Sequence, residues 1–160
     1  MNSSNQQVII ERLTKYSEPD AAELGKLMSF LSDRFNGDPI TRELLEAIIS
    51  SPLHDQLVAR LDGHIVGAAT VSIGMGVAAG MLGHLEDFVT DPGVRRQGVG
   101  SMVWQEVITW CKERGVNLYF TSRPHRTAAH DFYLAHGAVI KNTTVFYVDT
   151  TTDKTRQNHV

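Results

Sequence analysis

Arg95-Arg96-Gln97-Gly98-Val99-Gly100 is the stretch of this chain that decides the fold. It separates an apolar, strand-like run, residues 85–90, from a long amphipathic helical pattern that begins near Gly98. The N–H groups and the dipole at the start of a helix attract an anion, and glycines let the backbone approach it closely. The arginines can add charge-assisted hydrogen bonds to phosphate oxygens. The stretch therefore predicts a phosphate-binding turn between a strand and a helix.

The spacing of the glycines excludes two common phosphate-binding motifs. A Walker A loop requires Gly-Lys-Ser or Gly-Lys-Thr, and neither tripeptide occurs in the sequence. A dinucleotide-binding GxGxxG motif would need a glycine where the chain has Val103. What remains is Arg-x-x-Gly-x-Gly, formed by Arg95, Gly98 and Gly100. A surface turn before a helix could show the same short pattern, so the rest of the chain has to support the assignment.

A second pattern lies nearer the C-terminus, in Ala129-His130-Asp131-Phe132-Tyr133-Leu134-Ala135-His136-Gly137-Ala138. Together, the two segments resemble the GNAT superfamily of N-acetyltransferases, whose members combine Arg-x-x-Gly-x-Gly with Ala-x-x-Phe-Tyr-x-x-x-Gly-Phe. Ala138 stands where the family usually has phenylalanine. The resemblance extends over residues 8–148 and is strongest over residues 83–137.

The hydrophobic periodicity predicts an α/β fold with a mixed sheet around a central β-α-β unit. The expected order of elements is β-α-α-β-β-β-α-β-α-β-β, which matches the order of the GNAT fold. The expected strands are residues 8–13, 56–61, 64–73, 81–90, 116–121, 138–140 and 143–148. The expected helices begin near Ser17, Thr41, Gly98 and Thr127.

Composition predicts a single ordinary domain over residues 1–160, with its core in residues 8–148 and a polar tail in residues 149–160. The net charge of −3 does not favour a nucleic-acid partner, and no apolar run is long enough to span a membrane. The first seven residues lack the order of a signal peptide. The single Cys111 cannot form an internal disulfide, which fits the reducing cytoplasm. We therefore expect a cytoplasmic protein.

The resemblance implies that acetyl-CoA is the acetyl donor and assigns the residues that hold it. In the family, the pantetheine arm pairs with strand backbone at the positions of Phe88, Val89 and Thr90. The following turn then holds the pyrophosphate. In this chain, the turn consists of Arg95, Arg96, Gln97, Gly98, Val99, Gly100 and Ser101.

Three residues are the candidate catalytic groups. Tyr133 matches the family tyrosine that gives a proton or hydrogen bond to the departing thiolate, and the alternative is a packing residue beside Phe132. Glu86 and Asp87 are acidic residues within an apolar strand. Because successive strand residues point to opposite faces, at most one of them would face a given pocket unless a bulge intervenes.

The acidic pair also bears on the acceptor. Residues 83–87 resemble the glucosamine-6-phosphate N-acetyltransferase branch, in which such a pair lies at the sugar site. Either carboxylate could bind an amino group or accept its proton through water, and His84 is a second candidate for the base.

No metal-binding pattern and no nucleophile motif occurs in the sequence. Cys111 lies in the middle of a predicted helix, where a small buried hydrophobe is expected. We therefore expect direct transfer of an acetyl group to the primary amine of a small molecule, with an amino sugar or amino-acid derivative favoured. The alternatives are a protein or peptide N-acetyltransferase and a non-catalytic acyl-CoA-binding module. The apolar residues 143–148 would allow a homodimer.

Overall fold

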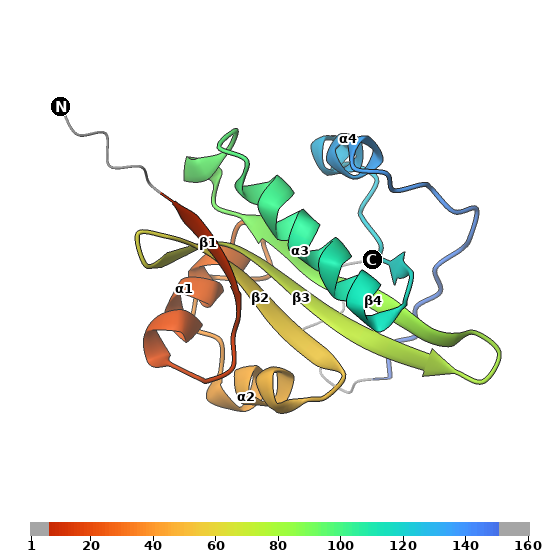
Figure 1. The fold of residues 1–160 in the computed structure, drawn as a ribbon, viewed down its shortest axis with the longest axis horizontal. Helices are drawn as coiled ribbons and strands as arrows, with labels where there is room; N and C mark the ends of the chain where they lie inside the picture. The colour runs from red at the N-terminus through yellow and green to blue at the C-terminus, as the bar shows by residue number, and fades with distance from the viewer. Residues whose placement is uncertain (1–6, 151–160) are drawn as a thin grey trace. The chain divides into compact units, whose positions relative to one another are not determined.

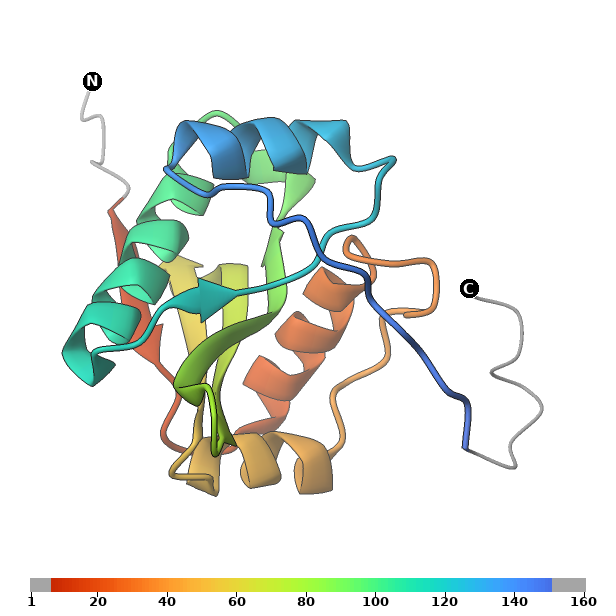
Figure 2. The same cartoon turned by 90° about the vertical axis from the view of Figure 1, so that its right-hand side faces the viewer.

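The computed structural model describes residues 7–150, which divide into two compact units at Thr121 and Ser122. Figures 1 and 2 show their ribbons from two directions. The strands are β1 (Val8–Arg12), β2 (His54–Leu61), β3 (His64–Gly76), β4 (Gly80–Thr90) and β5 (Leu118–Tyr119). The helices are α1 (Glu18–Met28), α2 (Arg42–Ser50), the 3₁₀ helix η1 (Pro92–Val94), α3 (Val99–Arg114) and α4 (Thr127–Ala135). All of these except α4 belong to the first unit.

The first unit contains one five-stranded sheet in the order β1-β2-β3-β4-β5. Neighbouring strands are antiparallel except β4 and β5, which are parallel and are connected through α3. Asp62 and Gly63 form the turn between β2 and β3 with φ of 53° and 86°, a left-handed geometry that suits a two-residue hairpin turn. The predicted mixed α/β sheet with a central β-α-β unit is confirmed.

The sheet lies between helices, with α3 on one face and α1 on the other (Figure 2). On the α3 face, a Cβ at Gly67 would lie 3.1 Å from Val99 and 3.3 Å from Val103, so glycine lets α3 approach β3 closely. On the other face, α1 and α2 contribute to an apolar core cluster. That cluster includes Leu24, Leu27, Met28, Leu45, Val58, Ala68 and Val89.

Local capping residues fix the ends of several helices. The Ser17 Oγ accepts a hydrogen bond from the Asp20 N–H at 3.2 Å, and Thr41 caps α2 in the same way through Leu44. Gly115 ends α3 with φ of 63°, a left-handed conformation that glycine adopts without a Cβ penalty. The starts of α1 and α2 match the predicted helix starts.

The structure differs from the prediction toward the C-terminus. The strand expected over residues 116–121 is only the two-residue β5, and residues 138–150 form neither helix nor strand. The expected strands 138–140 and 143–148 therefore do not form here. Alternating apolar residues show that a segment can pair, but a strand also needs a partner edge. Without one, Phe146 and Val148 are 88% and 77% exposed.

Two further features complete the description. Most of the polar tail expected over residues 149–160 lies outside the described residues, which end at position 150. Among residues 7–150, no helix has the length and apolar character needed to cross a bilayer.

Candidate active site

An irregularity in β4 brings both acidic candidates to one face of the sheet. Thr70 of β3 pairs with Asp87, whereas the next residue, Val71, pairs with Leu85, so that Glu86 is an extra residue in β4. This is a β-bulge, in which two residues of one strand oppose one residue of its neighbour. Because of this bulge, both carboxylates can face the same pocket.

Contacts with β3 confirm the common face. The Ser72 hydroxyl donates to Glu86 at 2.7 Å, and Thr70 is the register partner of Asp87. Thr70 and Ser72 are two residues apart on one strand and so lie on the same face. Ala68, two residues earlier, packs in the core cluster with α1, which identifies this as the α1 face of the sheet.

We call this set of side chains the polar face. Gln56 lies opposite Thr70, and His84 lies opposite Ser72, so both join the same side of the sheet. The polar face consists of Gln56, Thr70, Ser72, His84, Glu86 and Asp87. Sequence analysis missed Gln56, Thr70 and Ser72, although polar residues inside apolar strands were a signal that could have found them.

Asp87 has the environment of a carboxyl group that holds a proton more tightly than usual. Its burial raises the pKa, the hydrogen bond from Thr70 opposes this effect, and the charge of Glu86 adds to it. Neither Asp87 nor Glu86 forms an ion pair with any of residues 7–150. The pair can therefore attract a cationic group, and Asp87 is suited to accept a proton.

The predicted phosphate-binding turn lies between β4 and α3, as expected. Arg96 and Gly98 both have left-handed backbone conformations, with φ of 63° and 80°. Such a φ is unusual for arginine and is enriched in functional turns. Gly98 is the N-cap of α3 and offers no side chain to the N–H groups of the first helical turn. Both Arg95 and Arg96 are exposed, so the turn combines backbone donors with two cations.

The edge of β4 that faces β5 is only partly paired. β5 pairs with β4 at Gly83 and His84, and no strand of residues 7–150 pairs with this edge further along. The predicted cofactor-arm residues Phe88, Val89 and Thr90 lie in this part of β4. The Phe88 ring packs edge-on against Trp104 at 5.9 Å, and Val89 is buried. Their side chains therefore hold β4 in place.

Tyr133 lies on α4, in the second unit. It is half-buried, and its ring is 5.8 Å from that of Phe132 at an angle of 77°. Burial raises the pKa of Tyr133, while the positive charge of Arg126 opposes this effect. The phenol is therefore protonated at neutral pH, as a hydrogen-bond donor must be.

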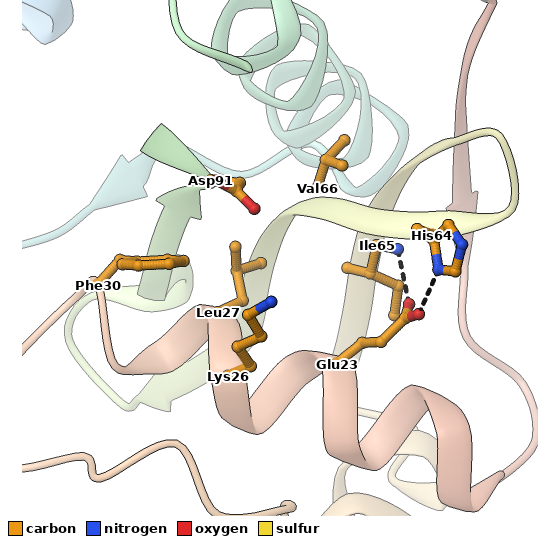
Figure 3. A pocket seen from close by; sticks show the side chains of 8 residues that line it. All are labelled: Glu23, Lys26, Leu27, Phe30, His64, Ile65, Val66 and Asp91. Atoms are coloured by element: carbon orange, nitrogen blue, oxygen red, sulfur yellow. Dashed lines mark hydrogen bonds and ion pairs between the residues drawn. The ribbon is translucent and has the colours of Figure 1, made fainter. Parts of the chain in front are cut away.

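A separate pocket of about 160 Å³ lies between α1, the start of β3 and Asp91, which follows β4 (Figure 3). One Glu23 oxygen accepts a hydrogen bond from the Ile65 N–H at 2.7 Å, and the other lies 2.7 Å from the His64 ring. These contacts hold α1 to β3. The pocket contains none of the predicted site residues. It is lined by Glu23, Lys26, Leu27, Phe30, His64, Ile65, Val66 and Asp91.

The environments of Cys111 and the histidines favour neither a thiol nucleophile nor a metal site among the described residues. Cys111 is buried on α3, and burial raises the pKa of its thiol, which disfavours the nucleophilic thiolate. Among residues 7–150, no three His, Cys, Asp or Glu side chains are grouped so that they could hold a metal ion.

Comparison of the sequence with models of protein families identifies the family. The model described as "Acetyltransferase (GNAT) family" matches residues 25–138, a stretch that contains the bulge, the turn and Tyr133. The chain belongs to the GNAT family.

Several solved structures share this GNAT fold. An aminoglycoside acetyltransferase, meta-AAC0020, from an uncultured soil metagenomic sample is 22% identical with a TM-score of 0.78, over 90% of this chain and 96% of that one. The aminoglycoside N-acetyltransferase AAC(6')-Iy, solved in complex with CoA, is 18% identical with a TM-score of 0.78, over 94% and 100%. A transcriptional regulator from Bacillus halodurans C-125 is 22% identical with a TM-score of 0.77, over 89% and 100%. At these identities the likeness establishes the fold.

Proposed function

We propose that this protein transfers the acetyl group of acetyl-CoA directly to a primary amine of a small molecule. The observation that carries the proposal is the bulge in β4, which places two carboxylates without ion-pair partners on one face of the strand. The same strand has an open edge and leads into a turn suited to phosphate. Membership of the GNAT family supports acetyl transfer as the chemistry.

The residues present fit acetyl-CoA. The left-handed turn, the uncapped start of α3 and the two arginines suit the pyrophosphate. A Cβ at Gly98 would have no atom within 4 Å, so the turn is not filled by neighbouring side chains. The backbone of β4 at Phe88, Val89 and Thr90, beyond its pairing with β5, would pair with the amide groups of the pantetheine arm, as an added strand does. Acetyl-CoA supplies an activated thioester and a thiol leaving group.

The polar face supplies the groups that act on the amine. Glu86 attracts the acceptor as an ammonium ion, and Asp87 takes the proton that the nitrogen must lose, directly or through one water. The neutral nitrogen then attacks the thioester carbon, and the bond between this carbon and sulfur breaks. Tyr133 donates a hydrogen bond or proton to the departing thiolate. His84, on the same face, is the second candidate for the base.

An amino sugar or amino-acid derivative is the acceptor that we favour. Two adjacent carboxylates suit a polar molecule with at least one ammonium group, and residues 83–87 resemble the glucosamine-6-phosphate branch. Two of the solved structures with this fold are described as aminoglycoside acetyltransferases, and aminoglycosides carry several amino groups on sugar rings. A peptide amine is the alternative acceptor.

Binding and turnover together test the proposal. Calorimetry with acetyl-CoA should show binding, and thiol release should be rapid with one class in a panel of amino sugars, amino acids, polyamines and peptides. Asp87→Asn should lower kcat by about 100-fold and leave the affinity for acetyl-CoA nearly unchanged, because it removes a proton acceptor. Asp62→Asn, in the hairpin turn, is the matched control. Binding without thiol release from any amine would instead favour an acyl-CoA-binding module.

A further inference from the structure

Gln56 is buried on β2, across β3 from the candidate base Asp87, in an orientation that its own hydrogen bonds determine. Only 3% of Gln56 is exposed. Its Nε2 group donates to the backbone oxygens of Leu57 at 3.3 Å and Ala69 at 3.2 Å. Because both of these partners are acceptors, the amide nitrogen must face them. The Oε1 atom of Gln56 is then directed at Thr70, whose hydroxyl donates to it at 2.9 Å.

Thr70 is the register partner of Gln56 on β2 and of Asp87 on β4, and it has a single hydroxyl proton, which it donates to Gln56. While this proton points to Gln56, Asp87 can bind the Thr70 oxygen only as a carboxylic acid that donates its own proton. An ionised Asp87 requires the Thr70 proton to turn toward it, and Gln56 Oε1 then loses its donor. A buried oxygen without a donor is costly, so ionisation of Asp87 is disfavoured.

We propose that Gln56 and Thr70 are positioning residues that fix the Asp87 carboxyl on the polar face and make its ionisation compete with the hydrogen bond between Gln56 and Thr70. This competition makes Asp87 a stronger base toward the proton of an incoming ammonium group. Its value for catalysis rests on the proposed function. The competition itself is a property of the folded chain and can be measured without any substrate.

The other charged groups around Asp87 act separately from this pair. Glu86 repels a second negative charge, and Ser72 holds Glu86 in place. The helices packed on this face contribute apolar side chains to the core cluster. His84 lies on the same face. Of the charged groups on α1 and α2, Asp20 pairs with Arg60, Glu23 with His64 and Arg42 with Glu46, and the others are Glu18, Lys26 and Glu43. The nearby His54 is hydrogen-bonded to Ser51.

The test is a carbon-13 NMR titration of the Asp87 carboxyl in the full-length protein, with neither acetyl-CoA nor amine present. Gln56→Met removes the competing oxygen at similar volume, so we expect the Asp87 midpoint to fall by about one pH unit. Thr70→Val removes the hydroxyl that can turn to donate to the carboxylate, so the midpoint should rise. Thr70→Ser keeps the hydroxyl and should restore a midpoint close to that of the wild type.

A midpoint that stays unchanged in Gln56→Met, or that moves in the same direction in Gln56→Met and Thr70→Val, overturns the proposal. Thermal melts show which variants fold, and Gln56→Leu replaces Gln56→Met if the latter does not. Because the titration uses no substrate, its result tests the roles of Gln56 and Thr70 even if the protein transfers no acetyl group. Where transfer is found, the acid limb of kcat/KM should shift with the same sign as the titration.

Discussion

At the scale of single residues, the site depends on one inserted position. In a regular strand without a bulge, the side chains of Glu86 and Asp87 would point to opposite faces of β4. The bulge places both carboxylates on the α1 face of the sheet. There Ser72 donates a hydrogen bond to Glu86, and Thr70 lies opposite Asp87. A deletion or insertion of one residue in β4 would therefore damage the polar face more than most substitutions within it.

The phosphate-binding turn gives a prediction at this scale. Gly98→Asp introduces a carboxylate at the start of α3, where the proposed pyrophosphate lies. We expect the Kd for CoA to rise by about tenfold or more, because like charges repel and the donors become occupied by the new side chain. Isothermal titration calorimetry measures the change.

Gly115→Asp is the matched control for this change. Gly115 also has a left-handed backbone, with φ of 63° against 80° at Gly98, but it lies at the opposite end of α3. Both variants carry the same backbone strain, and only Gly98→Asp should weaken CoA binding. Equal Kd values for Gly98→Asp and the wild type would contradict the assignment of the turn.

At the scale of elements, α1 is held unusually close to the segment that follows it. A Cβ at Gly25 would lie 1.9 Å from the backbone oxygen of Asp38 and 2.7 Å from the carbon of the same carbonyl. Backbone atoms cannot move aside as the end of a flexible side chain can. Glycine at this position is therefore required by the contact between α1 and the loop before α2.

Gly25→Ala tests this contact, because the two possible effects change the free energy of unfolding in opposite directions. Helix propensity alone predicts that alanine stabilises an interior helical position by about 1 kcal/mol. The close contact predicts the opposite, a loss of about 2 kcal/mol or more in the free energy of unfolding. Urea denaturation distinguishes the two results, and a stabilised variant would show that α1 can shift away from the loop.

Some of these elements could be predicted from the sequence alone, and others could not. Helix starts and the Asp62-Gly63 turn were predictable because neighbouring residues determine them, as Ser17 and Thr41 do. The bulge at Glu86 depends on the register with β3, which no local pattern encodes. The same holds for Gln56 and Thr70, which meet only after β2 and β3 pair. The last two expected strands needed a partner edge, which apolar alternation does not supply, and the homodimer stays a prediction.

At the scale of the whole molecule, the half-buried carboxyl of Asp87 would serve the proposed function at a cost in stability. The pKa of Asp87 is raised by burial in the folded state above its usual value near 3.8. The favourable contribution of its protonated form is complete below that usual value and is lost as the pH rises through the folded-state pKa. At neutral pH the ionised Asp87 therefore opposes folding.

Asp87→Asn should consequently raise the Tm at pH 7 while it removes activity. The gain over the wild type should shrink as the pH is lowered toward 4, because the wild-type carboxyl then becomes neutral as well. Thermal melts of both proteins across this range measure the difference. A variant that is less stable than the wild type at pH 7 would show that the carboxylate is stabilised by the fold.

The open edge of β4 has a consequence for how this chain can diverge. Amide groups of the main chain are present whichever side chains occupy positions 88–90, so recognition along this edge does not depend on their identity. Selection at these positions acts on packing, as the contact between Phe88 and Trp104 illustrates. A lineage can therefore replace almost every side chain along the strand and still keep the same main-chain donors and acceptors.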